Sequence, residues 1–384
     1  MNPAAEFDVV VYGATGYTGR LVAEHLAQRY GVGGEVKWAM AGRSQAKLEE
    51  VRDEIGAPKD TPLIVADADD PGSLEAMVKR AKAVITTVGP YQLYGDKLIA
   101  ACAAAGTDYL DLTGEPNWMA RTIVAHHETA QKTGARLCHS CGFDSIPFEL
   151  GVLFCEETAR AKLGGPVPRV KGRVRSIKGG LSGGTAASGA ATMAAIQKDP
   201  SQLAVMMNDF ALTPGFQGPP QPPANQVQHD EDVGADVGPF MMAVINAKNV
   251  HRSNFLMGHP YGEDFQYDEM SILVPGAPTE FTAMGQGGGP KPGEGPTKEE
   301  RETGFFDVVF VGIAADGRKV RVSVKGDRDP GYGSTSKMIA ESALCLVKAC
   351  PDTPGGVWTP GAAMRTKLID RLQRNAGLTF AVEG

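Results

Sequence analysis

The chain has 384 residues, of which 42% are hydrophobic and 22% are charged, and its formal net charge is −7. The length favours two domains, and the negative charge argues against nucleic acid as the main partner. No basic leader with an apolar core opens the chain, and no apolar run approaches the roughly 18 residues of a membrane span, so we expect a cytoplasmic protein.

The first predicted strand, Phe7–Tyr12, is followed by three glycines at three-residue spacing and then by an amphipathic helix. Glycines between a strand and a helix allow a tight turn and a close backbone approach to a pyrophosphate. An ordinary glycine-rich turn in an α/β core is the alternative. We therefore assign this turn to cofactor binding, through Gly13, Ala14, Thr15, Gly16, Tyr17, Thr18 and Gly19.

The second predicted strand, residues 36–41, ends at Gly42, Arg43 and Ser44. A site for NAD usually has Asp or Glu at this position, where the carboxylate accepts the ribose 2′-hydroxyl. Here a guanidinium and a hydroxyl are available instead, and both can bind a 2′-phosphate. A solvent-facing arginine is the alternative. The sequence therefore predicts NADP as the cofactor, bound by Arg43 and Ser44.

Further strands at residues 63–66, 83–88, 107–112 and 135–139 alternate with helices at 45–55, 71–80, 96–105 and 117–133. This alternation predicts a doubly wound parallel sheet, in which ligands bind beyond the carboxyl ends of the strands. The strand ends add four residues to the predicted cofactor site: Asp67, Val88, Gly89 and Pro90.

Three residues near the same edge are candidates for catalysis. Tyr91 and Tyr94 follow the fourth strand, where the nicotinamide ring is expected, and either could donate a proton after hydride transfer. Aromatic packing against the cofactor is the alternative role. Asp144 follows the sixth strand and could instead orient a substrate amine.

The Cys138–Cys141 pair has ligand-like spacing, but no second Cys/His pair lies nearby, so we predict structural cysteines and no metal site. The six cysteines are scattered, as expected for reduced thiols. His126 and His127 fall in a polar helix and are expected on a solvated face.

The second half of the chain has a different pattern. After a helix at residues 147–162, basic residues alternate with valines in residues 169–176 and again in 319–325, and the latter strand can form a hairpin with residues 305–313. This predicts a mixed or antiparallel sheet with helices on one side. The basic face is expected to be solvated, with an acidic partner such as a carrier protein as the alternative.

Four other stretches carry weaker predictions. Residues 179–188 could hold an anion at a helix start or simply cap that helix. Residues 240–245 are expected to form a core strand rather than a membrane anchor. Residues 214–228 and 285–297, rich in Pro, Gly and Gln, are expected to be mobile surface loops.

We divide the chain into an NADP-binding domain at residues 1–145, a mixed-sheet domain at 146–328, and C-terminal helices at 329–384 that pack back on the first domain. Helices are predicted at 336–349 and 362–374. The segment between them is short and rich in helix breakers, which argues against a third core.

Eight motifs in order make the chain resemble the saccharopine dehydrogenase-like oxidoreductases, in the bacterial branch that includes the trans-acting enoyl reductases. They are GATGYTG (13–19), AGR (41–43), VGPY (88–91), YLDLTGE (109–115), CGFDSIP (141–147), SGGTAAS (182–188), DPGYGSTSKM (329–338) and GGVWTP (355–360). The resemblance implies an N-terminal Rossmann domain, a second α/β domain with a mixed sheet, and C-terminal helices that return to the first domain.

The resemblance also implies an NAD(P)H-dependent oxidoreductase, and we expect it to reduce an activated C=C bond in a lipid- or polyketide-type acyl substrate. That substrate is a small molecule or is bound to a carrier. A saccharopine-type C=N reductase or amino-acid dehydrogenase and a non-catalytic NADP-binding redox sensor are the alternatives. A homodimer and peripheral membrane contact are left open.

Overall fold

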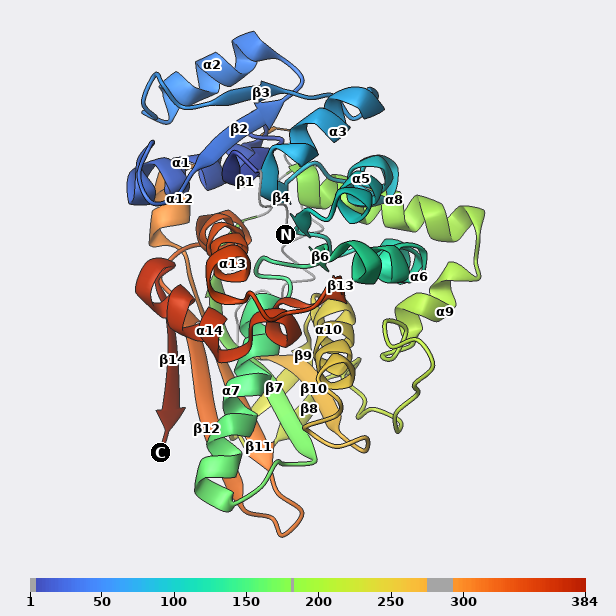
Figure 1. The fold of residues 1–384 in the computed structure, drawn as a ribbon. Coiled ribbons are helices and arrows are strands. Elements are labelled where there is room, and N and C mark those ends of the chain that lie inside the picture. The colour runs from blue at the N-terminus through green and yellow to red at the C-terminus, as the bar shows by residue number, and fades with distance from the viewer. Residues whose placement is uncertain (1–4, 181–182, 275–292) are drawn as a thin grey trace.

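The computed structural model describes residues 5–180, 183–274 and 293–384, and within them the chain forms two seven-stranded sheets. The first sheet is drawn at the top of Figure 1 and the second below it, with α13 and α14 between them. The predicted fold class, a parallel Rossmann sheet followed by an α/β unit with a mixed sheet, is confirmed.

All seven strands of the first sheet are parallel, in the order β13-β6-β5-β4-β1-β2-β3. Their bounds are β1 Phe7–Tyr12, β2 Trp38–Gly42, β3 Leu63–Val65, β4 Ala81–Thr86, β5 Asp108–Leu110, β6 Arg136–Cys138 and β13 Gly356–Trp358. The first six strands were predicted from their apolar runs. The seventh was not, and it comes from the distant C-terminal segment.

Helices cover both faces of this sheet. The bounds are α1 Tyr17–Tyr30, α2 Gln45–Glu54, α3 Pro71–Lys79, α4 Tyr91–Tyr94, α5 Asp96–Ala105 and α6 Pro116–Thr133. Val9, Val11 and Ile85 point into one core, and Val10 and Val84 into the other, as the two-residue period of a strand requires. Both faces of the parallel sheet are therefore buried from solvent, which explains the nearly continuous apolar runs of its strands.

The second sheet is mixed, in the order β14-β12-β11-β7-β10-β9-β8, with β7 and β10 parallel and the other neighbours antiparallel. Its strands are β7 Arg169–Lys178, β8 Gln228–Asp230, β9 Ala235–Pro239, β10 Gln266–Ile272, β11 Phe305–Ile313, β12 Lys319–Gly326 and β14 Leu378–Glu383. The predicted hairpin of β11 and β12 is confirmed, and it pairs from Phe306 with Gly326 to Ile313 with Lys319.

The remaining helical elements lie after the first six strands in sequence. They are α7 Ile146–Leu163, α8 Gly183–Lys198, α9 Gln202–Met207, α10 Ala243–Leu256, α12 Lys298–Thr303, the π-helix η1 Pro330–Ser334, α13 Thr335–Ala349 and α14 Pro360–Asn375. Helix α7 packs on β11 and β12, and α10 packs on β10. The core strand predicted at residues 240–245 is wrong, because these residues instead lead into α10.

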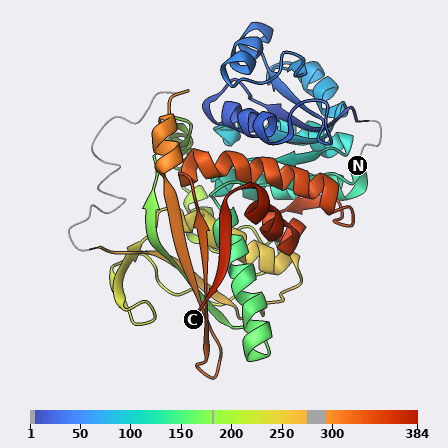
Figure 2. The same cartoon turned by 90° about the vertical axis from the view of Figure 1, so that its left-hand side faces the viewer.

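The C-terminal segment belongs to both sheets. Helix α13 packs against α1 and against the face of β4, β13 extends the parallel sheet beside β6, and β14 extends the mixed sheet beside β12. Figure 2 shows α13 running between the two sheets. The domain boundaries at residues 145/146 and 328/329 stay predictions.

The basic residues of β7 are paired with carboxylates, so the prediction of a solvated basic face is wrong for this strand, whereas the Lys319 and Lys325 side chains of β12 are 52% and 51% exposed. Arg173 binds Asp230 and Asp268, both at 2.8 Å, and Lys171 binds Asp230 at 3.0 Å and Asp232 at 2.6 Å. Arg173 is only 2% exposed. Asp230 lies in β8, Asp232 lies in the turn after it, and Asp268 lies in β10, the strand next to β7.

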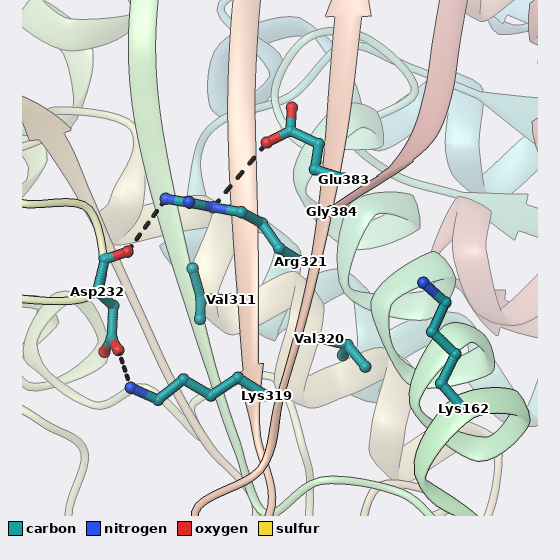
Figure 3. Close-up of a pocket in the computed structure, with 8 residues that line it drawn as sticks. All are labelled: Lys162, Asp232, Val311, Lys319, Val320, Arg321, Glu383 and Gly384. Atoms are coloured by element: carbon teal, nitrogen blue, oxygen red, sulfur yellow. Dashed lines mark hydrogen bonds and ion pairs between the residues drawn. The ribbon is translucent and has the colours of Figure 1, made fainter.

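Further carboxylates extend this pairing toward β14. Arg175 binds Asp307 at 2.7 Å and Glu383 at 2.6 Å. Figure 3 shows Lys319 and Arg321 of β12 reaching Asp232 and Glu383 around a pocket of about 300 Å³. None of the predicted site residues lines this pocket. The charge of this face is therefore largely compensated within the chain.

Some predicted stretches are only partly described. Residues 181–182 of the stretch 179–188 and residues 285–292 of the predicted loop 285–297 lie outside the described residues. Residues 214–228 are irregular up to β8, and Gln221 fastens them to β10 by accepting a 2.9 Å bond from the Tyr267 amide. Within the described ranges, no helix is long and apolar enough to cross a membrane.

Candidate active site

The turn between β1 and α1 is built on its three glycines. Gly13 has a φ of +85°, and a Cβ atom on it would lie 2.7 Å from Cγ2 of Val88. A Cβ atom on Gly19 would overlap the carbonyl oxygen of Gly13. Gly16 is exposed and precedes α1 with no side-chain cap on that helix. The turn therefore fits a pyrophosphate, which needs a close backbone and the first amides of the helix.

The other four residues of the turn differ in their surroundings. Ala14 is buried, and its amide donates to the Ala41 carbonyl at 3.1 Å. Thr15 is partly exposed and lies beside Gly42 at the tip of β2. Tyr17 and Thr18, both partly exposed, begin α1. The turn thus brings the end of β1 to the end of β2, where an adenosine ribose would lie.

Arg43 lies at this edge with its side chain exposed, and within the described parts of the chain it forms no hydrogen bond or ion pair. Ser44 caps α2, because its hydroxyl oxygen accepts a 3.3 Å bond from the Lys47 amide. That bond leaves the hydroxyl proton of Ser44 available to an acceptor. Both groups can therefore bind a 2′-phosphate without breaking an internal contact.

The other predicted cofactor residues also follow strand ends. Asp67 is partly exposed, and its Oδ1 accepts a 2.9 Å bond from the Asp69 amide in the turn after β3. Val88 packs against Gly13, and Pro90 is the N-cap of α4. Gly89 faces α8, since a Cβ atom on it would lie 3.6 Å from Oγ of Ser188. Their contacts with a cofactor stay predictions.

Tyr91 is buried, and its hydroxyl is already engaged on both sides. It donates to the Thr86 carbonyl at 3.1 Å and accepts from the Leu112 amide at 3.1 Å. Burial raises the pKa of Tyr91 well above its usual value. The hydroxyl therefore holds the ends of β4 and β5 together, which argues against Tyr91 as the proton donor. Tyr94 is 52% exposed at the end of α4, away from this network.

Asp144 lies in a compact turn between β6 and α7. The amide of Phe143 before it donates to Oγ1 of Thr335 at 2.9 Å, and Ser145 after it accepts a 2.8 Å bond from Nδ2 of Asn249. A Cβ atom on Gly142 would lie 2.8 Å from Leu112 Cδ2. The position of Asp144 is thus fixed by contacts of its neighbours with the loop after β5, with α10 and with the start of α13.

Asp144 is mostly buried, and its carboxyl group forms no hydrogen bond or ion pair with any residue that the structure describes. It faces Gly114 beyond β5, where a Cβ atom would lie 3.9 Å from Oδ2. Burial away from water raises the pKa of Asp144 to about 7. A carboxyl group that changes protonation near neutral pH can act as a general acid or base. Of the three catalytic candidates, Asp144 has the most suitable surroundings.

Next to Asp144 lies a buried polar cluster of Asn246, Asn249, Tyr267 and Glu269, which the sequence did not predict. Glu269 of β10 accepts from the Tyr267 hydroxyl at 2.6 Å and from Nδ2 of Asn246 at 2.7 Å, and burial raises its pKa to about 8. The Oδ1 atoms of Asn246 and Asn249 are buried and have no hydrogen-bond partner among the described residues. Helix α10 was not predicted, and its polar residues gave no signal that they would be buried.

The cysteines and histidines contribute to structure. All six cysteines are free and buried, and His139 is held between Asp111 at 2.7 Å and Thr122 at 3.1 Å. His127 is partly buried, and its Nδ1 accepts a 3.2 Å bond from the Val357 amide, so it supports β13 rather than lying on a solvated face. Among the described residues, no cluster of three His, Cys, Asp or Glu side chains could hold a metal ion.

Comparison with known proteins agrees with this geometry. Residues 9–138 match the family model "Saccharopine dehydrogenase NADP binding domain". A putative trans-acting enoyl reductase of Mycobacterium tuberculosis is 38% identical over 96% of this chain and 95% of its own length, and a trans-acting enoyl reductase of Mycobacterium ulcerans is 36% identical over 98% of each. The chain belongs to the saccharopine dehydrogenase-like family.

The family match confirms NADP as the cofactor, in agreement with the exposed guanidinium at the end of β2. Among solved structures, an apo saccharopine dehydrogenase (L-Glu forming) from Saccharomyces cerevisiae aligns over 98% of this chain and 100% of its own, with a TM-score of 0.58 and 11% identity. At that identity the similarity extends to the fold alone. The protein is therefore an NADP-dependent oxidoreductase with the saccharopine dehydrogenase fold.

Proposed function

We propose that the protein is an NADPH-dependent enoyl reductase, which saturates a C=C bond conjugated to the carbonyl group of an acyl substrate. The observation that carries this proposal is the 36–38% identity with trans-acting enoyl reductases over nearly the whole chain. These alignments cover 96–98% of the chain, so the similarity extends over both sheets and is not confined to the dinucleotide-binding domain. The acyl group is presented as a thioester, either on a small molecule or on a carrier.

NADPH held by the glycines of the turn and by Arg43 would supply the hydride that the β-carbon of the conjugated bond accepts. Asp144 in its protonated form donates a proton to the α-carbon, which consumes the π electron pair and leaves Asp144 ionised. Its pKa of about 7 lets it recover a proton from water in each cycle. Tyr91 fixes the end of β4 beside the turn, and the glycines of that turn bind the pyrophosphate.

A saccharopine-type reduction of a C=N bond is the second candidate, and one observation favours it. Asp144 and the Oδ1 atoms of Asn246 and Asn249 have no hydrogen-bond partner in the part of the chain that the structure describes, so they could act as acceptors for a substrate amine. In that reaction Asp144 must be ionised, whereas enoyl reduction needs its protonated form. The two candidates therefore predict opposite responses to pH near the pKa of this residue.

The test is to follow loss of NADPH with an α,β-unsaturated acyl thioester and, separately, with a 2-oxo acid plus an amino acid. We expect turnover with the thioester, with one saturated product formed for each NADPH consumed. We also expect the activity to decline as pH rises through about 7. Turnover with the oxo acid and amine alone would reassign the protein to C=N reduction. No turnover with either class would contradict the enoyl reductase proposal.

A further inference from the structure

Tyr17, the first residue of α1, contacts parts of the chain that lie far beyond the dinucleotide-binding sheet. Its hydroxyl donates to the carbonyl of Pro296 and accepts a 3.0 Å bond from Nη1 of Arg301. The edge of its ring packs against Tyr332 of η1, with 5.2 Å between ring centroids. A side chain of the pyrophosphate-binding turn is therefore fixed by residues that lie 279 or more positions later in the chain, between 296 and 332.

Arg301 is held firmly where it meets Tyr17. Its Nη1 also donates to the Pro296 carbonyl at 2.7 Å, and its own carbonyl accepts a 2.9 Å bond from the Asp329 amide. Helix α12, which carries it, begins with a capping box between Thr297 and Glu300. The guanidinium carbon lies 5.7 Å from the centroid of the Tyr17 ring, within cation–π range. The guanidinium is thus positioned before any cofactor binds.

Arg301 differs from the nearby Arg20 in that no carboxylate among the described residues balances its charge. Arg20, whose guanidinium carbon lies 5.9 Å from the same ring centroid, forms an ion pair with Glu54 at 2.8 Å. No carboxylate within the described ranges pairs with Arg301, and its Nε and Nη2 atoms donate to none of the described residues. A rigid, partly exposed guanidinium with two free donor atoms therefore lies beside the turn that binds a diphosphate.

We propose that Arg301 is a cofactor-binding residue, which donates hydrogen bonds to the pyrophosphate oxygens of NADPH from the second half of the chain. Guanidinium forks bind phosphate oxygens well, and Tyr17 sets the distance between this fork and the first turn of α1. Arg301 and Arg43 then act on different parts of the same molecule. Arg43 recognises the 2′-phosphate, and Arg301 recognises the pyrophosphate that NADPH shares with NADH.

This division of roles gives a binding test that does not depend on which substrate the enzyme reduces. The dissociation constants of NADPH, NADH and adenosine 2′-monophosphate are measured for the wild type and for Arg301→Met. We expect the constants for both dinucleotides to rise by the same factor, roughly tenfold or more, as for loss of one charge-assisted bond. Adenosine 2′-monophosphate lacks a pyrophosphate, so its affinity should stay unchanged.

Arg318→Met is the matched control, because it removes the same charge from the exposed turn after β11, where Arg318 pairs with Asp316. It should leave all three constants unchanged. If thermal unfolding shows that Arg301→Met is not folded, Arg301→Gln replaces it, since glutamine keeps a polar amide donor but has no charge. Unchanged dinucleotide affinity in the folded variant, an effect on NADPH alone, or an equal loss for adenosine 2′-monophosphate would each overturn the proposal.

Discussion

Replacing Arg43 with alanine tests how the protein selects its cofactor. The side chain is exposed and forms no hydrogen bond or ion pair within the described parts of the chain, so its removal costs no internal contact. Its bond to a 2′-phosphate is charge-assisted and is worth about 1.5–3 kcal/mol. At about 1.4 kcal/mol per decade, NADPH should bind roughly ten- to more than a hundredfold more weakly to the variant.

NADH has no 2′-phosphate, so its affinity for the Arg43→Ala variant should barely change. The assay is titration of both cofactors into wild type and variant, by fluorescence or calorimetry. Lys79→Ala is the control, because it removes an equal charge from the end of α3, where Lys79 pairs with Glu75 at 3.6 Å. Equal wild-type affinities for the two cofactors, or an unchanged ratio in Arg43→Ala, would refute the reasoning.

Three further predictions follow from the same structure. Asp144→Asn should lower kcat with an enoyl thioester by roughly 10²–10⁴-fold at unchanged NADPH affinity, and full activity in this variant would exclude Asp144 as the acid. Tyr91→Phe should lower the free energy of unfolding in urea by about 1–3 kcal/mol, because Thr86 O and Leu112 N lose their partner; the exposed Tyr94→Phe should not. Burial raises the pKa of Glu156 from 4.5 to about 8. Between these two pH values the folded state keeps a proton that the unfolded state releases, so the free energy of unfolding falls as pH rises from about 4.5 to 8. Glu156→Gln should make that fall shallower, and an unchanged slope in urea denaturation would contradict the linkage.

The parallel sheet and its turn could be predicted because their signals are local. Each strand from β1 to β6 is a short apolar run beside an amphipathic helix, and Asp70 with Pro71 marks the start of α3 as expected. Strand β13 gave no such signal, since it has three residues and pairs only with β6, more than 200 positions earlier. Its place is determined by the tertiary structure.

Helix α10 shows why part of the candidate site could not be predicted. Asn246, Lys248, Asn249 and Arg252 would suggest a surface helix, yet all are at most 2% exposed. They are buried because a helix and a strand from elsewhere in the chain, α9 and β13, supply hydrogen-bond partners. Lys248 donates to the Met206 carbonyl at 2.8 Å, and Arg252 donates to the Val357 carbonyl at 2.7 Å. Hydrophobic periodicity cannot reveal partners that are distant in sequence.

The basic strand β7 illustrates the same limit in another form. Its alternation of charged and apolar residues correctly predicted a strand with one apolar face. What covers the other face depends on Asp230, Asp268 and Glu383, which are between 57 and 208 positions away from the arginines they bind. Buried cations need such partners, but the pattern of one strand does not show where they come from.

The C-terminal segment supplies one edge strand to each sheet, β13 to the first and β14 to the second, and this affects the nascent chain during synthesis. A ribosome makes β6 and β12 well before the strands that pair with them, β13 and β14. Until residues 356–383 emerge, β6 and β12 are themselves unpaired edge strands, which the finished protein covers with β13 and β14, and such exposed edges can recruit strands from other molecules. A stop codon ahead of residue 356 would therefore leave both halves of the protein prone to aggregate, rather than remove one peripheral helix.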